Sequence, residues 1–447
     1  MKTNNDLISK DIKKLIFQIA IPSSVGLFFN TMYNVVDTYF AGTISTEAIA
    51  ALSYSFMVYF LFLSVSFGVS SAMTVLIGNA LGRHKKSEAK LYVANGLGLF
   101  FMVSLFLIFI GFICVKEVFI LMGAKSELDL ALEYTYIILL GIFPMLLGLG
   151  INAVLIALGD TKSYRNTLIL GFFLNIILTP LFLYGINGYL EFGFKGIAIS
   201  TVLIQFINLG YMFYKLHNTK LFISPKQKNI KPNIKIYKNI FHQGYPISLN
   251  MFMMSFGTLL VTSFVASYGY ESVAAFGIGY RVEQIVLLPM LGLNTAVATL
   301  VANNYGAKNL NRINEIRTHA LKYGYIMSTF GLFILVLFGK YIIAIFDDNP
   351  TVIDITYTYI VFEGFILYAY ITLFISTSTL QGIKKPFMIP IISFYRQLLM
   401  PTILLYIVVY YFTLPIIWVW IAMTFIIFSA AIFMYFYTQK QLSLLRF

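Results

Sequence analysis

Asp37 is an acidic residue inside a long apolar stretch of the chain. The surrounding segment, MYNVVDTYFAG (residues 32–42), offers no lysine or arginine to neutralise it, and Tyr33 and Asn34 lie about one helical turn earlier. A carboxylate at the middle of a bilayer costs roughly 3 kcal/mol on insertion scales, so such residues usually have a function. We expect Asp37 to bind a monovalent cation or to carry a proton, in a polar pocket to which Tyr33 and Asn34 contribute.

Two later apolar segments carry further oxygen-bearing side chains that we expect at a similar depth. The segment LNIILTPLF contains Asn175 and, one turn further, Thr179, and the next apolar segment contains Ser200 and Thr201. If both segments pack against the helix of Asp37, one carboxylate, one amide oxygen and several hydroxyl groups converge. Such a cluster suits Na⁺ or a proton on the carboxylate. The alternative is a hydrogen-bonded cluster that only joins three helices.

Glu283, Glu363 and Arg396 are three more charged residues in apolar segments, all predicted near mid-depth. Two interpretations of these residues are open. Arg396 neutralises one of the two acids in a buried ion pair, or a carboxylate contacts a cationic substrate directly. Arg281, two residues before Glu283, is expected to pair along its own helix or with the helix before it.

The composition predicts the elements that position these residues. The 447-residue chain is 59% hydrophobic and 11% charged, whereas about a quarter of the residues of a soluble protein are charged. Apolar runs of about 20 residues, each long enough to cross a bilayer, recur along the whole chain. They predict an all-α polytopic membrane protein, because the strands of a membrane β-barrel would alternate in polarity. The twelve candidate helices centre near residues 28, 65, 102, 142, 175, 205, 254, 289, 331, 367, 398 and 426.

Lysine and arginine residues indicate the orientation of these helices. Basic connections such as GRHKKSEAK, GDTKSYR and GIKKP follow the even-numbered helices, whereas the odd-numbered connections are poor in basic residues or mixed. Because cytoplasmic loops carry the excess of Lys and Arg, we expect both termini in the cytoplasm and the protein in the inner membrane. The net charge of +13 is accounted for in this way, so no nucleic-acid partner is expected. The single cysteine, Cys114, gives no disulfide framework and no thiolate metal site.

The chain also repeats itself at an offset of 224 residues. Pro22 aligns with Pro246, whereas Asp37 aligns with Val261, so coupling chemistry is expected in the first half only. An even number of helices in each half makes the repeat parallel. Pro22 and Pro246 each remove a backbone hydrogen bond near the inner end of a helix, which produces either a static kink or a hinge.

Two six-helix lobes follow from the repeat. We assign residues 1–215 to the first lobe, 216–235 to a basic cytoplasmic linker and 236–447 to the second lobe. Two lobes that rock about a central cleft are the architecture of alternating access. Aromatic and methionine side chains on the first helix of each lobe would suit flat, lipophilic cations in that cleft. They are Phe28, Phe29, Tyr33, Phe252, Met253, Met254 and Phe256.

Several motifs, in order along the chain, resemble those of the multidrug and toxic compound extrusion (MATE) transporters. They are IPSSVGLFFNTMYNVVDTYFAG, GNALGRHKKSEA, LIALGDTKSYRN and NIILTPLFLYGI in the first half, and GIGYRVEQIVLLPMLGLNTAVATLVANNYGA and LQGIKKP in the second. The resemblance covers essentially the whole chain. It implies a V-shaped pair of six-helix lobes and export of organic cations by Na⁺ or H⁺ antiport, without a metal or organic cofactor beyond the coupling ion.

The resemblance also implies site residues. The first-lobe cation site of the family has an aspartate, an asparagine and a threonine that match Asp37, Asn175 and Thr201. Many members have a second aspartate where this chain has Thr179, so the choice between Na⁺ and H⁺ is left open. One branch has acids in helices 7 and 10 of the second lobe. This chain has no acid in helix 7 and has Tyr370 at the helix 10 position, so that site is not carried over.

Two other classes of protein fit the sequence less well than a cation-coupled exporter. A flippase for lipid-linked oligosaccharides, from the same superfamily, would need several arginines in its cavity, whereas only Arg281 and Arg396 lie in apolar segments. A membrane enzyme would need a catalytic motif, and no HExxH, Gly-x-Ser-x-Gly or phosphate-binding loop is found. We therefore expect a monomeric exporter of small organic cations in the lipid bilayer, and not an enzyme.

Overall fold

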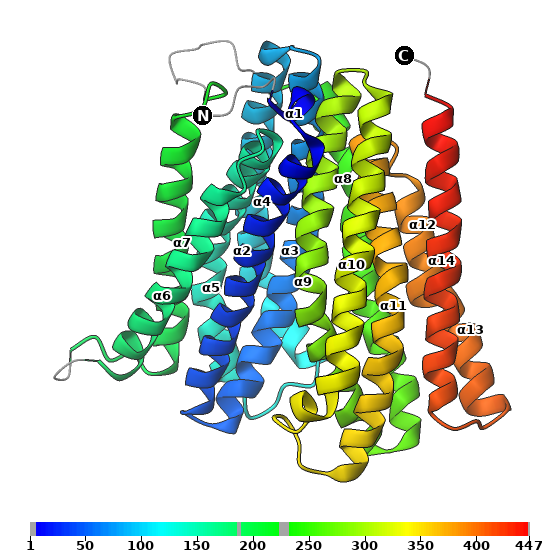
Figure 1. Ribbon diagram of the computed structural model, residues 1–447. Helices are drawn as coiled ribbons and strands as arrows, with labels where there is room; N and C mark the ends of the chain where they lie inside the picture. The colour runs from blue at the N-terminus through cyan, green and yellow to red at the C-terminus, as the bar shows by residue number, and fades with distance from the viewer. Residues whose placement is uncertain (1–5, 186–188, 223–231, 446–447) are drawn as a thin grey trace. The chain divides into compact units, whose positions relative to one another are not determined.

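The computed structural model describes residues 6–185, 189–222 and 232–445. In this part of the chain, twelve helical segments are long and apolar enough to cross a membrane, which confirms the predicted all-α membrane architecture (Figure 1). The continuous segments are α2 (Ile12–Gly42), α3 (Thr46–Gly82), α4 (Lys86–Leu121), α5 (Leu128–Ala157), α6 (Lys162–Tyr184), α7 (Phe194–His217), α8 (Ile234–Val265), α9 (Tyr270–Gly306), α10 (Leu310–Ile343), α11 (Pro350–Gly382) and α14 (Ile417–Ser443). The remaining span combines α12 (Met388–Phe394), the π-helical turn η2 (Tyr395–Leu399), α13 (Met400–Tyr406) and a second π-helical turn, η3 (Ile407–Tyr411). Two short elements, α1 (Asp6–Ser9) and the 3₁₀ turn η1 (Ala266–Tyr268), adjoin α2 and α8.

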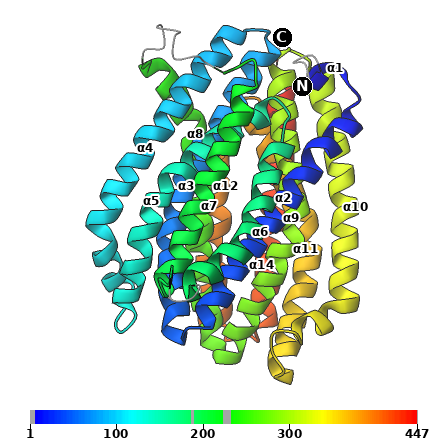
Figure 2. The ribbon, with the colours of Figure 1, turned by 90° about the vertical axis from the view of Figure 1, so that its left-hand side faces the viewer.

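Packing divides the chain into two compact units. Unit 1 contains residues 25–248, and unit 2 contains residues 6–24 and 249–445 of the described chain. In unit 1, α5 packs against α3, α4 and α7. In unit 2, α9, α10 and α11 pack against one another (Figure 2). Helix α11 also packs against α14.

The units differ from the predicted lobes, 1–215 and 236–447, at the beginnings of two helices. Helix α2 begins in unit 2 and continues in unit 1, and α8 does the reverse. The cause at α2 is burial of its first apolar side chains in the core of unit 2, a set that contains Ile12, Leu15, Ile16 and Ile19. Residues 223–231 of the predicted linker lie outside the described residues. The division into two lobes joined by a linker remains a prediction.

A glycine allows the beginning of α2 to approach α9 closely. A Cβ added at Gly292 would lie 2.0 Å from the hydroxyl oxygen of Ser24 and 2.5 Å from the carbonyl oxygen of Ala20. Gly68 of α3 meets Ser248 of α8 in the same way. This pair is the repeat equivalent of the first, because Gly68 aligns with Gly292 and Ser24 aligns with Ser248 at the offset of 224 residues. Small residues let membrane helices pack closely, because no hydrophobic driving force holds the helices together in lipid.

Replacing Gly292 with alanine is expected to lower the thermal stability of the purified protein. The added methyl group must push α2 away from α9, and overpacking of this kind typically costs about 1–3 kcal/mol. The measurement is the unfolding midpoint of the variant in detergent. Gly148→Ala is the matched control, because a Cβ at Gly148 meets nothing within 4 Å. Equal midpoints for the two variants would contradict the close contact at Gly292.

Pro22 and Pro246 lie inside α2 and α8, each two residues before the point where the helix changes unit. Both helices are continuous through the proline. The predicted hinges therefore coincide with the positions where each helix changes its packing partners, and their movement remains a prediction.

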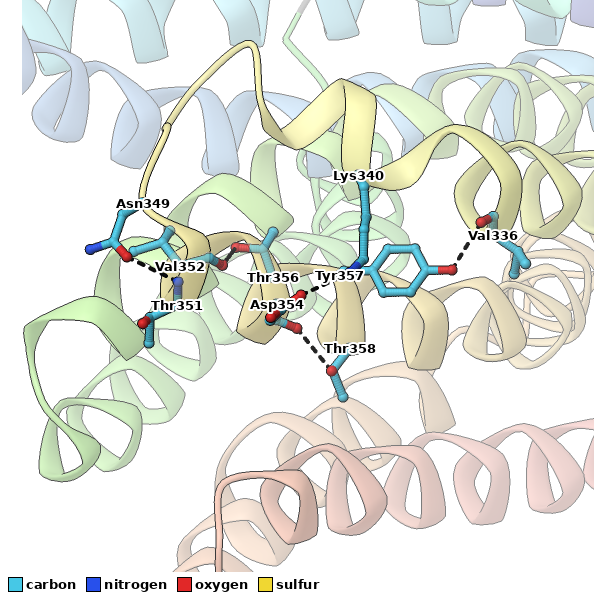
Figure 3. A network of polar contacts seen from close by, with 9 residues as sticks. All are labelled: Val336, Lys340, Asn349, Thr351, Val352, Asp354, Thr356, Tyr357 and Thr358. Atoms are coloured by element: carbon cyan, nitrogen blue, oxygen red, sulfur yellow. Dashed lines mark hydrogen bonds and ion pairs between the residues drawn. The ribbon is translucent and has the colours of Figure 1, made fainter.

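The connection between α10 and α11 in unit 2 is ordered by an exposed polar network (Figure 3). The Lys340 ammonium lies 2.8 Å from a carboxylate oxygen of Asp354 and 5.3 Å from the centroid of the Tyr357 ring. The Asn349 side chain caps α11 by accepting a hydrogen bond of 2.9 Å from the Thr351 amide. Exposed ion pairs contribute only about 0–1 kcal/mol, so this network orients the connection and adds little to stability.

Candidate functional site

Helices α2, α6 and α7 of unit 1 bring the predicted oxygen-bearing side chains together around Asp37. The carboxylate is 6% exposed, and Asn175, Thr179 and Ser200 are fully buried. Gly171 of α6 lies near both other helices, since a Cβ there would be 3.2 Å from the Asn208 amide nitrogen on α7 and 3.9 Å, an ordinary contact distance, from the Tyr33 ring on α2. The site thus depends on a close approach of three helices.

Two donors hold the Asp37 carboxylate. The side-chain amide of Asn175 donates to one carboxylate oxygen at 2.8 Å, and the hydroxyl of Thr201 donates to the other at 3.4 Å. The hydroxyl of Tyr33 in turn donates to Thr201 at 3.0 Å. These contacts bring together Asp37, Asn175, Thr201 and Tyr33, as the sequence suggests for a polar pocket.

Thr179 extends the cluster away from Asp37. The Asn175 amide also donates to the Thr179 hydroxyl at 3.0 Å, and the hydroxyls of Thr179 and Ser200 lie 2.8 Å apart. Ser200 then donates to the carbonyl of Ile197 at 2.8 Å. Thr179 is therefore one residue removed from the carboxylate and contacts it only through Asn175.

Asn34 does not join the cluster, although the sequence places it near Asp37. Its side-chain amide donates to the carbonyl of Asn30 at 3.1 Å, and the residue is exposed. The reason is the helical step of about 100° per residue, which puts Tyr33 and Asn34 on opposite sides of the Asp37 direction. Only the Tyr33 side faces α7.

The electrostatics of the site leave the carboxylate without a protein counter-charge. Asp37 accepts hydrogen bonds from Asn175 and Thr201, and no lysine or arginine of the described chain contributes to its electrostatics. The side-chain oxygen of Asn175 is buried and has no hydrogen-bond partner. A buried negative charge and an unpartnered acceptor next to each other fit either a small cation or a proton on the carboxylate.

Asn208 is a neighbouring polar residue for which the sequence pattern predicts no role. It lies seven residues after Thr201 on α7, and therefore two turns away on the same face, and its side-chain oxygen is buried without a partner. Its amide nitrogen is the atom nearest to Gly171. The spacing of seven residues from Thr201 is the sequence feature that would have predicted Asn208 on the same face of α7.

A second group of buried acids lies in unit 2. The hydroxyl of Tyr359 on α11 donates to the Glu283 carboxylate on α9 at 2.9 Å. Glu363, one turn after Tyr359, is 4% exposed and has one carboxylate oxygen without a hydrogen-bond partner. Aromatic rings border the group, with the Tyr359 and Trp420 centroids 4.8 Å apart.

Arg396 is close enough to Glu283 and Glu363 for its charge to act on both carboxylates, and the predicted ion pair remains a prediction. The salt bridges of the described residues do not include Arg396, and its guanidinium carbon lies 5.5 Å from the centroid of the Tyr370 ring. Arg396 belongs to the π-helical turn η2, which changes the direction of its side chain relative to a regular α-helix. A sequence pattern gives no signal for such a turn. Arg281, in contrast, is exposed.

Comparison with known proteins identifies the family. The sequence model described as MatE matches residues 22–181 and 246–407, and the second match begins 224 residues after the first. The chain belongs to the MATE family. The double match also agrees with the offset of the internal repeat.

Curated relatives of this MATE protein include several transporters. A FAD transporter of Shewanella oneidensis is 25% identical over 355 residues, which cover 79% of this chain and 78% of that protein. A probable multidrug resistance protein NorM of Thermotoga maritima is 26% identical over 352 residues, which cover 77% and 75% of the two chains. This MATE protein is thus related to multidrug transporters over most of its length.

Solved structures agree with the fold. A MOP superfamily transporter from Pyrococcus furiosus superimposes with a TM-score of 0.92 at 25% identity, covering 99% of this chain and 98% of that one. An outward-facing multidrug resistance MATE transporter gives the same TM-score, identity and coverage. The MATE assignment and the fold therefore agree, and the protein is a multi-pass membrane transporter.

The side chains predicted to line a substrate cleft are located in both units of the MATE fold. Phe28 of unit 1 is 44% exposed, and Phe252 of unit 2 is 42% exposed. Met253, next to Phe252, is partly buried. Large apolar side chains this exposed are available to lipid or to a ligand, and their role in a cleft remains a prediction.

Proposed function

We propose that this MATE protein exports lipophilic organic cations in exchange for H⁺ or Na⁺, with Asp37 as the coupling residue. The observation that carries the proposal is the buried Asp37 carboxylate, which has no basic partner in the described chain and lies beside the unpartnered amide oxygen of Asn175. A charge left in this state requires a mobile cation or a proton to balance it. The family relationship to multidrug transporters supports a small-molecule substrate.

The proposed cycle follows from the hydrogen bonds of Asp37. Uptake of H⁺ or Na⁺ from outside neutralises the carboxylate, so the donors on Asn175 and Thr201 lose a charged acceptor. The contacts of α2 with α6 and α7 then change, and α2 bends near Pro22. This rearrangement releases the bound substrate and favours return to the inward-facing state.

Glu283 and Glu363 are the proposed sites of attraction for a cationic substrate. Neither acid forms a direct salt bridge with Arg396 in the described chain, although the Arg396 charge acts on both. The rings of Tyr359 and Trp420 beside them provide faces for a flat cation. Two carboxylates near one guanidinium leave one negative charge in excess, which supports contact with a cationic substrate. We also propose that the protein lies in the inner membrane as a monomer. Both of its termini then face the cytoplasm.

Replacing Glu363 with glutamine is expected to weaken binding of a monovalent organic cation about tenfold, which corresponds to ~1.4 kcal/mol. The amide keeps the size of the side chain but removes the charge. The measurement is the KM for ethidium transport in proteoliposomes. Glu315→Gln is the control, because Glu315 is an exposed glutamate of the same unit. An unchanged KM in Glu363→Gln would exclude Glu363 from substrate binding.

A flavin nucleotide is the second candidate substrate, because a curated relative is a FAD transporter. Within this chain, Arg396 is the buried cation that an anionic group would contact, although it shares its surroundings with Glu283 and Glu363. A substrate with phosphate groups would reverse the expected effect of the acids, so Glu363→Gln would then leave transport unchanged or improve it.

The experiment that tests the proposed function is transport by the wild-type protein in proteoliposomes. A pH gradient alone and a Na⁺ gradient alone are imposed, with ethidium and FAD as separate substrates. Ethidium movement driven by one gradient supports cation antiport and identifies the ion. FAD movement without ethidium movement favours the nucleotide. Failure to move either substrate under both gradients would contradict the proposal.

A further inference from the structure

Arg317 is a buried arginine in unit 2 that the proposed transport cycle does not use. It lies on α10, is 5% exposed, and reaches α14. One guanidinium nitrogen donates to the side-chain oxygen of Gln439, and another donates to the carbonyl oxygen of Tyr435 at 3.2 Å. The guanidinium carbon also lies 4.4 Å from the centroid of the Tyr435 ring. Every one of these partners is uncharged.

No carboxylate of the described chain forms a salt bridge with Arg317. Glu315, two residues earlier on α10, is exposed and lies 3.7 Å from His319 instead. Removing a charge from water costs several kcal/mol, and buried charges are normally paired. The chain thus supplies hydrogen bonds to this cation and leaves its charge uncompensated.

Two buried hydrogen-bond donors in this region also lack partners. One is the Nε atom of Arg317, and the other is the hydroxyl oxygen of Thr438, which is fully buried. Thr438 lies on the same turn of α14 as Tyr435 and Gln439, the two residues that contact Arg317. An unpartnered N–H, an unpartnered O–H and an unpaired positive charge together favour an anion with several acceptor oxygens.

The position of this group in the fold suggests the source of the anion. Arg317 lies seven residues after the start of α10, or about 10 Å along the helix, and Gln439 lies four residues before the end of α14. Both helix ends belong to the end of unit 2 that carries basic residues. Lys440 follows Gln439 and is exposed, and Lys385 donates to Gln441 of α14 at 2.8 Å. Basic pockets between membrane helices near the cytoplasmic surface are typical sites for anionic head groups.

We infer that Arg317 and Thr438, between α10 and α14, bind the phosphodiester of an anionic phospholipid, with Lys440 at the entrance. The exposed amide of Gln439, which now covers one guanidinium nitrogen, gives way to a phosphate oxygen. The bound lipid joins α10 to the end of α14 and neutralises Arg317. This site is independent of Asp37 and of the proposed substrate.

The test is thermal unfolding of the full-length protein in a mild detergent, with lipid added as mixed micelles. Phosphatidylglycerol is the anionic probe, phosphatidylcholine is the zwitterionic control, and inorganic phosphate tests for a free anion. The wild-type midpoint is expected to rise with phosphatidylglycerol and to stay unchanged with inorganic phosphate. Phosphatidylcholine has the same phosphodiester but no net charge, so it is expected to give a smaller rise than phosphatidylglycerol, and an equal rise would overturn the preference for an anionic lipid. In Arg317→Gln, the phosphatidylglycerol concentration for half-maximal stabilisation is expected to rise about tenfold or more.

Two further variants keep the test decisive. Thr438→Val preserves the contacts of Arg317 with α14 and removes only the unpartnered hydroxyl, so it tests the site even if Arg317→Gln does not fold. Lys322→Gln, at an exposed lysine of the same helix, is the control for a general loss of positive charge. Equal stabilisation of wild type, Arg317→Gln and Thr438→Val by phosphatidylglycerol would overturn the inference and leave Arg317 as a contact between two helices. If inorganic phosphate stabilises the protein as much as phosphatidylglycerol does, the ligand is a free anion and the inference of a lipid is wrong.

Discussion

Substitution of Asp37 by asparagine is expected to abolish gradient-driven export while the protein remains folded. Asparagine keeps the size of the side chain. It also keeps an oxygen that can accept a hydrogen bond from the Asn175 amide, which lies 2.8 Å from the carboxylate in the wild-type protein. It cannot take up a proton in the physiological range and carries no charge to hold Na⁺. The variant should also be at least as stable as wild type, because it removes a buried charge that costs roughly 3 kcal/mol at mid-membrane.

The measurement is ethidium efflux from proteoliposomes under a pH gradient and, separately, under a Na⁺ gradient. The variant is expected to show only the leak seen in protein-free vesicles under the gradient that drives the wild type. Asp348→Asn is the matched control, since it makes the same chemical change at an exposed position. Transport by Asp37→Asn at the wild-type rate would remove Asp37 as the coupling residue, and Glu283 and Glu363 would be tested next.

Substitution of Asn175 by alanine is expected to shift the ion dependence of exchange in a direction that depends on the ion. If H⁺ is the coupling ion, the proton concentration for half-maximal exchange should fall roughly 10- to 100-fold, because the lost hydrogen bond stabilises the charged carboxylate. If Na⁺ is the coupling ion, the Na⁺ concentration for half-maximal exchange should rise, because an oxygen ligand is lost. Hydrogen bonds to charged groups contribute about 1.5–3 kcal/mol, and this change removes the shorter of the two bonds to Asp37. It also removes the unpartnered amide oxygen that is available to a cation or to a protonated carboxyl group.

The same measurement on Thr201→Val separates the two donors. The Thr201 hydroxyl is 3.4 Å from the carboxylate, whereas the Asn175 amide is at 2.8 Å, so the threonine variant should have the smaller effect. Both variants should keep their maximal rate at saturating ion, because Asp37 is intact. An Asn175→Ala protein with unchanged ion dependence would show that Asn175 only joins α6 to α2.

Much of the site was predictable because its residues are rare in their surroundings. A carboxylate such as Asp37 stands out in an apolar segment, and Asn175 and Thr201 lie at matching depth in two other segments. Depth follows from counting residues along a helix at about 1.5 Å each. Direction around the helix axis is harder to predict, because it depends on which helices are neighbours. That is why Tyr33 joins the cluster and Asn34, one residue later, does not.

The sequence by itself determined the number of spans, their order and the internal repeat. Hydrophobic length is a local property, since each span must cover the bilayer with its own residues. The isolated acids were equally visible, because their cost is set by the membrane and not by their neighbours.

Only the tertiary structure decided which side chains meet. Arg396 lies in a π-helical turn with its guanidinium over the Tyr370 ring, and the first turns of α2 pack in unit 2 because their apolar side chains are buried in that core. In the sequence, Arg317 is an ordinary basic residue near the start of a helix. Its burial without a counter-charge results from its contact with α14, which the sequence does not show. These outcomes depend on contacts between residues far apart in the chain, which local pattern and hydropathy do not encode.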